Sequence, residues 1–459
     1  MYQVDFNKPI NVYFCGIGGI SMSALADVLM DAGFTVSGSD RASSALIERL
    51  INDGARIYIG QEAENVTKDI DVFVYTAAIH ADHPEMVKAK ELNIPIMTRA
   101  ELLGQMMKNY KMPIAISGTH GKTTVTSMIS DILVRADMDP TLLVGGILDS
   151  IGGTNLRIGH SDIFATEACE YTNSFLSFYP KASLILNVEE DHLDFFKDLD
   201  DIENSFHKFA SLSPKDGVVI IGEDIPGKAK IIDGIASPVV TFGRDSKADY
   251  YATDVHSDEM GIKHFTVNSS KEPMEFTLKV PGYHNVLNAL AAIALADYLE
   301  IDREVTRAAL ASFGGAKRRF EYRGSFNGVN LFDDYAHHPS EIEATLKAAK
   351  DYPHKKLWCI FQPHTYTRTK ALLDDFATAL SNADAVIMAK IYPARETDNL
   401  GISSDNVRQK IEELNTECYY IDTFEEIEKF VIKNCAPSDM LITMGAGDVV
   451  NIADDLMKK

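Results

Sequence analysis

The sequence predicts an α/β protein of three domains, each with a mainly parallel sheet. Near the N-terminus, and again near residue 118, a glycine-rich turn follows an apolar strand and precedes a helix. After residue 318, strands alternate with polar loops, which predicts a third domain of similar architecture. A chain of 459 residues, 46% apolar and 24% charged, has the length and composition of a globular protein with a large core.

The first domain is expected over residues 1–108. It opens with NVYFCGIGGISMSALADVLMDAG, which reads as a strand, a glycine turn and an amphipathic helix, and further strands are expected at 72–76 and 95–97. The turn, residues 16–21, matches G-x-G-x-x-G except that Ser21 replaces the third glycine. Asp40 ends the second strand, about where a ribose-binding acid would stand. We therefore expect a diphosphate at this helix N-terminus, and the turn does not specify nicotinamide.

The second glycine turn lies in IAISGTHGKTTVTS, residues 114–127, and we call residues 118–124 the phosphate loop. Gly118 and Gly121 let backbone N–H groups approach an anion, and the following helix adds its dipole. Lys122 can reach terminal phosphate oxygens, while the hydroxyl of Thr123 suits a phosphate-bound Mg²⁺. The motif is shorter than a Walker A sequence, which would need glycine at Ile116. It predicts binding of a nucleoside triphosphate.

Polar side chains follow two apolar strands of the central domain, expected over residues 109–317. Glu167 and Glu170 come just after a strand at 162–165, and Asn187 and His192 accompany a strand at 184–187. Strand ends of this kind face the ligand crevice of an open α/β sheet, where a carboxylate and a neutral imidazole can hold Mg²⁺. The alternative is a solvated helix start, favoured by three successive acids: Glu189, Glu190 and Asp191.

The last domain, residues 318–459, collects basic groups and histidines in or beside its loops. Strands are expected at 358–361, 385–389 and 440–444. The candidate side chains are Arg318, Arg319, Asp333, Asp334, His337, His338, His364, Arg368 and Arg395. A metal at His337 and His338 is disfavoured, because adjacent histidines diverge. Arginines suit carboxylates and phosphates, so we expect an anionic substrate.

The overall charge and the cysteines exclude several classes of protein. A net charge of −23, from 67 acidic and 44 basic residues, argues against nucleic-acid or anionic-membrane binding. Five scattered cysteines, Cys15, Cys169, Cys359, Cys418 and Cys435, without a CxxC pair are typical of reduced thiols. The N-terminal residues lack the pattern of a signal peptide, and we expect a cytoplasmic protein.

Together, several motifs carry a family resemblance: GIGGISMSALA, SGTHGKTT, EACEYTNSFL, NVEEDHLD, VPGYHNVLNALAAIA, FGGAKRRFEYRG, DDYAHHPSEI, FQPHTYTRTKALL and IYPARE. In this order, over nearly the whole chain, the set resembles the Mur ligases of peptidoglycan precursor synthesis. The resemblance implies a Rossmann-like domain for a UDP-sugar, a central ATPase domain and a C-terminal Rossmann-like domain that closes over the site. It also explains the unusual phosphate loop as the form that this family has.

The chemistry implied by the resemblance is an ATP-dependent ligation. ATP phosphorylates the lactyl carboxylate of UDP-N-acetylmuramic acid, and the amine of L-alanine attacks the acyl phosphate to give an amide, ADP and phosphate. Two Mg²⁺ ions, no nucleic acid, no membrane, and a monomer or weak homodimer are expected. The alternative within the family is a sister ligase that attaches murein tripeptide to the same UDP-sugar.

The resemblance also implies roles for individual residues. The UDP-sugar is assigned to Gly16, Gly18, Gly19, Ile20, Ser21, Asp40 and His80. ATP is assigned to Gly118, Thr119, His120, Gly121, Lys122, Thr123, Thr124, Asn285, Arg319 and Asp334, with the pair His284-Asn285 at adenine and Asp333 or Asp334 at ribose. The metal ligands are assigned to Thr123, Glu167 and His192. The catalytic residues are assigned to Lys122, Glu167, Asn187 and His192. The lactyl carboxylate or the alanine is assigned to His337, His364 and Arg368.

Two positions depart from the family pattern. Where many Mur ligases carry a carbamoylated lysine, this chain has Phe206, followed by His207 and Lys208, so we assign no such modification. The run Cys169-Glu170-Tyr171 replaces the D-E-S form.

Two readings outside the family explain less of the sequence. A dehydrogenase would leave the phosphate loop unexplained, and a guanine-nucleotide switch would need an N-K-x-D run, which does not follow the loop.

Overall fold

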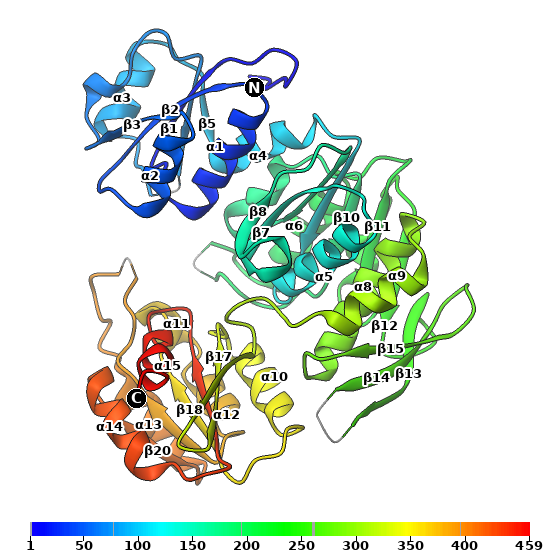
Figure 1. Cartoon of the computed structure of the whole chain (residues 1–459), viewed down its shortest axis with the longest axis vertical. Coiled ribbons are helices and arrows are strands. Elements are labelled where there is room, and N and C mark those ends of the chain that lie inside the picture. The colour runs from blue at the N-terminus through cyan, green and yellow to red at the C-terminus, as the bar shows by residue number, and fades with distance from the viewer. Residues whose placement is uncertain (1, 77, 194, 259–261, 395) are drawn as a thin grey trace. The chain divides into compact units, whose positions relative to one another are not determined.

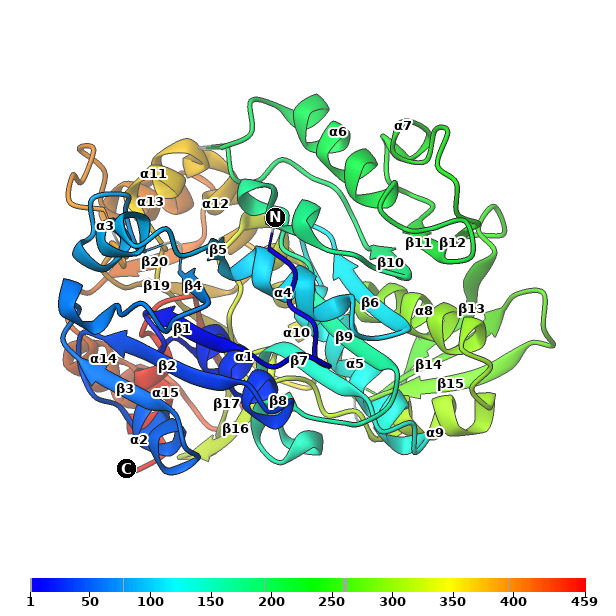
Figure 2. The same ribbon diagram turned by 90° about the horizontal axis from the view of Figure 1, so that it is seen from above.

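The computed structural model describes residues 2–76, 78–193, 195–258, 262–394 and 396–459 (Figure 1; Figure 2). The chain divides into two compact units. The first comprises Met1–Gly145, Asp149–Phe242 and Ala294–Ile301, and the second comprises Gly146–Leu148, Gly243–Ile293 and Asp302–Lys459.

A parallel sheet with the strand order β3-β2-β1-β4-β5 begins the first unit (Figure 1). Its strands are β1 (Asn11–Cys15), β2 (Thr35–Asp40), β3 (Arg56–Ile59), β4 (Val72–Tyr75) and β5 (Ile96–Thr98). The helices are α1 (Ile20–Asp31), α2 (Ala45–Asn52), η1 (Ala63–Asn65), α3 (Pro84–Glu91) and α4 (Arg99–Met107). Alternate residues of β1 point to opposite faces: Val12 and Phe14 pack with α1, α2 and α4, whereas Tyr13 and Cys15 pack with α3. Helices therefore cover both faces of this sheet.

A second, mainly parallel sheet, almost all of it in the first unit, runs β12-β11-β10-β6-β9-β7-β8. Its strands are β6 (Met112–Ser117), β7 (Thr141–Leu148), β8 (Thr154–Arg157), β9 (Ile163–Glu167), β10 (Ala182–Ile185), β11 (Val218–Gly222) and β12 (Val239–Gly243). The helices are α5 (Lys122–Arg135), η2 (Asp149–Ile151), η3 (Tyr171–Ser177), α6 (Leu199–Ala210) and α7 (Lys228–Ile231). Helix α4 packs closely on η3, since a Cβ at Gly104 would lie 1.9 Å from the carbonyl oxygen of Ser177.

An antiparallel meander begins the second unit: β13 (Tyr250–Ser257), β14 (Lys263–Asn268) and β15 (Met274–Leu278). Helix α8 (Tyr283–Tyr298) follows the meander in sequence, and α9 (Arg303–Ser312) packs on β15. The sequence patterns did not predict these antiparallel strands.

The remaining sheet of the second unit has the order β16-β17-β21-β18-β19-β20, with β16 antiparallel and the other pairs parallel. Its strands are β16 (Glu321–Phe326), β17 (Val329–Asp334), β18 (Leu357–Phe361), β19 (Ala385–Met388), β20 (Glu417–Tyr420) and β21 (Met440–Met444). The helices are α10 (Pro339–Ala349), α11 (Tyr366–Ala371), α12 (Leu373–Leu380), α13 (Ser404–Glu413), α14 (Phe424–Asn434) and α15 (Val450–Leu456). Separate hydrophobic clusters contain Phe361 and Ile360, so successive residues of β18 pack on opposite sides of this sheet.

These sheets confirm the predicted α/β fold with a Rossmann-like first domain, a mainly parallel central domain and a Rossmann-like last domain. The alternative interpretation of residues 189–191, a solvated helix start, is wrong, because α6 begins only at Leu199, after Asp198 caps it. Within the described residues, no helix is both long and apolar enough to span a bilayer. The five cysteines are free, and three of them, Cys15, Cys359 and Cys418, are buried.

Candidate active site

The first glycine turn connects β1 to α1. Gly16 has a φ of +85°, which glycine adopts without strain. The backbone N–H of Gly18 donates to Oδ2 of Asp40 over 2.8 Å, and Oδ1 of Asp40 accepts the N–H of Arg41. Asp40 therefore braces the turn, and its predicted ribose contact stays a prediction. Ser21 is half-buried, while the predicted ligand residues Ile20 and His80 are exposed.

The phosphate loop connects β6 to α5. Gly118 and Gly121 have φ values of +143° and +85°, so backbone conformations that favour glycine form both ends of its turn. Helix α5 begins at Lys122 with Gly121 as its N-cap, and no side chain among the described residues caps it. The first N–H groups of α5 are therefore available to an anion.

Asn187 braces the phosphate loop from the segment that follows β10. Its Oδ1 accepts the N–H of His120 over 2.7 Å, and its Nδ2 donates to the carbonyl of His120 over 3.0 Å. The carbonyl of Asn187 accepts the N–H of Thr119, whose hydroxyl in turn accepts the N–H of Glu189 over 2.9 Å. The carboxylate of Glu189 lies 3.3 Å from Nε2 of His120. These contacts fix the loop conformation from outside the loop.

Lys122 is held inside the loop by one carboxylate and two carbonyl groups. Its Nζ lies 3.0 Å from Oε2 of Glu170 and donates to the carbonyls of Gly118 and Thr119. Burial favours the neutral amine, but the negative groups around Lys122, above all Glu170, raise its pKa above the ordinary value. Lys122 is therefore a charged donor at the start of α5.

Glu170 connects Lys122 to His192. Its carboxylate is only 3% exposed, and Oε1 lies 3.7 Å from Nε2 of His192. The imidazole of His192 stacks on Tyr171, with ring centroids 4.5 Å apart. His192 has a φ of +54°, so it lies in a turn instead of a helix. The sequence analysis named Glu170 beside Glu167 at this strand end but gave it no individual role, and its pairing with Lys122 was not predicted.

Glu167 ends β9, which pairs with the strand that leads into the phosphate loop. It lies opposite Ile116 in the β6–β9 register. Its Oε1 accepts the backbone N–H of Gly145 over 2.6 Å, so β7 orients this carboxylate. Thr123 is buried in the first turn of α5 and Thr124 is half-buried. Hydroxyl and carboxylate oxygens of this kind are ligands that a hard cation prefers.

In the second unit, Asp333 and Asp334 end β17 and are both buried. Asp333 accepts hydrogen bonds from Nε of Arg318 and from the hydroxyl of Thr443. The oxygens of Asp334 accept the N–H groups of Phe320 and Ala336 over 2.8 and 2.7 Å.

Burial raises the pKa of the Asp334 carboxyl to about 6, although nearby Arg319 opposes this. Both carboxylates therefore organise the loops at the end of β17. Arg319 itself lies near Glu341, with 3.9 Å between the closest nitrogen and oxygen.

His337, His364 and Arg368 gather beside this strand end. The rings of His337 and His364 lie 6.2 Å apart, and Nδ1 of His337 lies 3.0 Å from the carbonyl oxygen of Tyr335. Burial lowers the pKa of His337 to about 4, and burial and Arg368 lower the pKa of His364. The buried Nδ1 of His364 has no hydrogen-bond partner within the described ranges. Neutral imidazoles beside an arginine can bind an anionic group or an amino group of a ligand.

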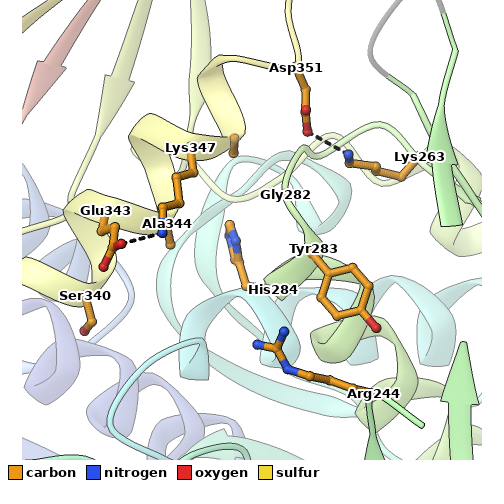
Figure 3. Close-up of a pocket in the computed structure, with 11 residues that line it drawn as sticks. Arg244, Lys263, Gly282, Tyr283, His284, Ser340, Glu343, Ala344, Lys347 and Asp351 are labelled. Atoms are coloured by element: carbon orange, nitrogen blue, oxygen red, sulfur yellow. Dashed lines mark hydrogen bonds and ion pairs between the residues drawn. The ribbon is translucent and has the colours of Figure 1, made fainter. Parts of the chain in front are cut away.

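A pocket of about 380 Å³ lies between the start of α8 and α10 (Figure 3). His284 projects toward α10, and the guanidinium carbon of Arg244 lies 5.3 Å from the ring centre of Tyr283. At the rim, Nζ of Lys263 donates to Asp351 over 2.6 Å. The sequence analysis did not predict Arg244 and Lys263 of this pocket, because they come from a loop and a strand that it had not identified.

Asn285, the partner of His284 in the predicted adenine pair, is buried. Its Nδ2 donates to the carbonyl of Pro281, and its Oδ1 accepts from Asn288. Asn285 therefore fixes the start of α8 beside His284.

The structure thus brings the predicted residues together in two groups. In the first unit the phosphate loop, Glu167, Asn187 and His192 meet around Lys122 and Glu170. In the second unit Asp334, His337, His364 and Arg368 meet at the end of β17. Arg395 lies outside the described residues.

Family models match most of the chain. The model described as "Mur ligase family, catalytic domain" matches residues 11–111, "Mur ligase middle domain" matches 116–296, and "Mur ligase, glutamate ligase domain" matches 318–447. A protein from Lachnospira eligens named UDP-N-acetylmuramate–L-alanine ligase is 56% identical over 460 residues, covering 100% of both chains. The chain belongs to the Mur ligase family.

Further Mur ligases support this conclusion. A relative with the same name from Agathobacter rectalis is 54% identical over 460 residues and covers 100% of both chains. The solved structure of UDP-N-acetylmuramate-alanine ligase from Thermotoga maritima is 30% identical, covers 98% of both chains and has a TM-score of 0.81. A murein peptide ligase from Psychrobacter arcticus, 24% identical with a TM-score of 0.70, shares the fold.

Proposed function

We propose that this chain ligates L-alanine to the lactyl carboxylate of UDP-N-acetylmuramic acid at the expense of ATP, in the synthesis of peptidoglycan precursors. Full-length relatives that are 56% and 54% identical bear the name of this activity. The geometric observation that supports it best is the cluster of Lys122, Glu170 and His192 beside a glycine-bounded loop and an uncapped helix. Such a site suits phosphoryl transfer from a nucleotide.

The reaction divides into two steps. A lactyl carboxylate oxygen attacks the γ-phosphorus of ATP, and the bond to the β-phosphate oxygen breaks to release ADP. The amine of L-alanine then attacks the acyl carbon, loses a proton, and phosphate leaves as the amide forms. Lys122 and the N–H groups of the phosphate loop neutralise charge on the phosphates, so catalysis here is mainly positioning and electrostatic stabilisation.

Mg²⁺ fits the donors at the end of β9 and the start of α5. Thr123 and Glu167 offer oxygen ligands, which this hard cation prefers, and Glu170 adds a buried negative charge nearby. His192 offers an imidazole nitrogen, a less usual ligand for Mg²⁺, for a second ion. The bound ions would neutralise phosphate charge.

The remaining assignments concern the residues that bind the UDP-sugar, the nucleoside part of ATP, and the lactyl carboxylate or the alanine. We assign the UDP-sugar to the first glycine turn, with Gly16, Gly18, Gly19, Ile20, Ser21, Asp40 and His80. Asn285, Arg319 and Asp334 serve the nucleoside part of ATP, while His337, His364 and Arg368 serve the lactyl carboxylate or the alanine. We place the domain boundaries at 1–108, 109–317 and 318–459, and expect a cytoplasmic monomer or weak homodimer.

Phosphate release tests this function. Purified protein with UDP-N-acetylmuramate, ATP and Mg²⁺ should release phosphate when L-alanine is added, and mass spectrometry should find the alanyl product. Glycine, L-serine and murein tripeptide serve as competing acceptors in parallel reactions. Phosphate release with tripeptide and not with L-alanine would contradict the proposal in favour of the sister ligase.

A further inference from the structure

A cysteine, a histidine and a glutamate converge in the first domain, on the face of the sheet covered by α3 (Figure 1). Cys15 is the last residue of β1, His83 occupies the N-cap position of α3 without a capping hydrogen bond from its side chain, and Glu85 lies in the first turn of α3. One ligand atom from each of these three residues lies within 4.8 Å of the other two. Sulfur, imidazole nitrogen and carboxylate oxygen are the usual ligands of zinc in proteins.

The carboxylate of Glu85 is fully buried and firmly oriented. Its Oε1 accepts from the hydroxyl of Tyr13 and from Nδ2 of Asn65, both over 2.9 Å, and Oε2 accepts from the hydroxyl of Ser39 over 2.7 Å. A carboxylate has about four lone-pair positions, so three neutral donors leave one position for a further partner. Metal-binding carboxylates are typically held in this way by donors behind them.

Cys15 and His83 lie beside this carboxylate, and the thiol of Cys15 hydrogen-bonds to it. Sγ of Cys15 lies 4.0 Å from Nδ1 of His83 and 3.5 Å from the side-chain amide of Gln61. A tetrahedral zinc ion, with bonds of about 2.3 Å to sulfur and 2.0 Å to nitrogen, places these two atoms about 3.5 Å apart. For this pair of atoms, a contraction of about half an ångström therefore suffices. Cys15 is buried and His83 is half-buried, so an ion could enter past the imidazole.

We propose that Cys15, His83 and Glu85 bind a single soft divalent cation of the Zn²⁺ type. Binding replaces the thiol proton: the Sγ–H bond breaks, a sulfur–metal bond forms and the proton leaves to solvent. A water completes four ligands, while Nε2 of Gln61 donates to the sulfur of Cys15. The donor set differs from that proposed for Mg²⁺, because a thiolate does not suit a hard cation. The inference is independent of the proposed ligase reaction.

The site would connect the end of β1 to the start of α3, two segments that lie 68 positions apart in sequence. Cys15 is followed directly by Gly16, the first residue of the glycine turn. A metal that binds the folded domain and not the unfolded chain stabilises the fold by mass action. Zn²⁺ should therefore raise the melting temperature of the protein.

Cobalt spectroscopy tests the proposal on the full chain after treatment with a chelator. One equivalent of Co²⁺ should produce a thiolate-to-cobalt charge-transfer band and the visible bands of a four-coordinate ion. Zn²⁺ should abolish these bands, whereas a large excess of Mg²⁺ should not. If Co²⁺ gives no charge-transfer band and Zn²⁺ leaves the melting temperature unchanged, the cluster is a hydrogen-bonded network only and the proposal is wrong.

Two variants and a control locate the metal. Cys15→Ser should lose the charge-transfer band, and His83→Asn, at a half-buried position, should weaken Co²⁺ binding about tenfold or more while Cys15 remains. The control is Cys435→Ser, because Cys435 is a free thiol that lies outside the cluster and is half-buried, whereas Cys15 is buried. A band that persists in Cys15→Ser overturns the assignment. If Cys15→Ser fails to fold, unchanged Co²⁺ affinity in His83→Asn overturns it instead.

Discussion

Nζ of Lys122 lies 3.0 Å from Oε2 of Glu170, a carboxylate that is 3% exposed. The lysine that is proposed to neutralise the phosphates of ATP thus already has a buried counter-charge in the protein alone. Because Nζ also contacts two loop carbonyls, it must exchange some of these partners when a triphosphate arrives. Glu170 therefore sets how much of the charge of Lys122 is available to the nucleotide.

Replacing Glu170 with glutamine should make the protein depend on nucleotide for its stability. Without the carboxylate, the cation of Lys122 loses its nearest counter-charge, which we expect to lower the free energy of unfolding by about 3–5 kcal/mol. A bound triphosphate restores a negative partner, so a non-hydrolysable ATP analogue should raise the melting temperature of Glu170→Gln more than that of wild type. Differential scanning fluorimetry measures both increments.

The matched control for this prediction is Glu189→Gln. Glu189 also pairs with a phosphate-loop residue, His120, but its side chain is 48% exposed, so removing its charge should cost little. Equal nucleotide-induced increments in Glu170→Gln and wild type would show that Glu170 does not control the charge of Lys122.

Replacing Lys122 with alanine should abolish ligation and leave UDP-sugar binding within a few-fold of wild type. Loss of one charged donor to a developing phosphate charge typically lowers kcat by about 10²–10³. The UDP-sugar is assigned to a different sheet, at the turn after β1, so its affinity should not depend on Lys122. Phosphate release and calorimetric titration with UDP-N-acetylmuramate separate the two effects.

Lys111→Ala is the control, because Lys111 pairs with Asp162 at the exposed start of β6. Its activity should be close to that of wild type. A comparable loss of UDP-sugar affinity in Lys122→Ala would mean that the assignment of substrates to domains is wrong.

Replacing Gly145 with alanine should impair activity with little effect on stability. A Cβ at Gly145 would lie 2.5 Å from both carboxylate oxygens of Glu167, and these oxygens end a flexible side chain that can move. Moving them breaks the hydrogen bond from the N–H of Gly145 and misplaces the carboxylate assigned to Mg²⁺. We expect kcat to fall about tenfold or more, with the free energy of unfolding changed by less than about 1 kcal/mol.

Gly314→Ala is the matched control for this prediction, because a Cβ at Gly314 meets no atom within 4 Å. Its kcat should remain near the wild-type value. Normal turnover in Gly145→Ala at several Mg²⁺ concentrations would indicate that the position of Glu167 is unimportant.

Part of this site could be predicted from the sequence, because it depends on local backbone conformations that glycine favours. Gly118 and Gly121 mark turns with positive φ, and an apolar strand before them with threonines after them fixes the register of the phosphate loop. Strand ends likewise identified Glu167 and Asn187, because neighbouring parallel strands end at the same edge of a sheet. These features depend on segments of a few residues, which the sequence patterns describe well.

Contacts between distant segments could not be predicted in the same way. The hydrogen bond between Gly145 and Glu167 requires that β7 lies next to β9, and residue spacing does not specify this order. The sequence patterns also did not indicate that the carboxylate of Asp40 accepts the N–H of Gly18 across the turn. The acids at residues 189–191 favoured a helix, but Glu189 instead binds the loop residue Thr119. Both hydrogen bonds depend on tertiary contacts, which local sequence patterns do not specify.

The stability of the second unit should fall in mild acid because of His337. Burial lowers the pKa of His337 to about 4 in the folded protein, against an ordinary value of about 6.5. Between these values the unfolded chain binds a proton that the folded protein does not, so stability is lost as the pH falls from 6.5 toward 4. His337→Asn removes this loss. The free energy of unfolding of the variant relative to wild type should therefore rise by about 1–2 kcal/mol between pH 7 and pH 5.

Asp334→Asn should give a shift of opposite sign, and urea denaturation of wild type and both variants at a series of pH values measures the two shifts. The folded pKa of Asp334, about 6, lies above its ordinary value of 3.8, so the folded protein binds the extra proton and wild-type stability falls as the pH rises from 4 to 6. The asparagine variant lacks this fall and should therefore gain stability relative to wild type as the pH rises. If the free energy of unfolding relative to wild type changes with pH in opposite directions for the two variants, His337 is neutral and burial sets both pKa values. A change in the same direction for both variants would contradict the burial of these two groups at the end of β17.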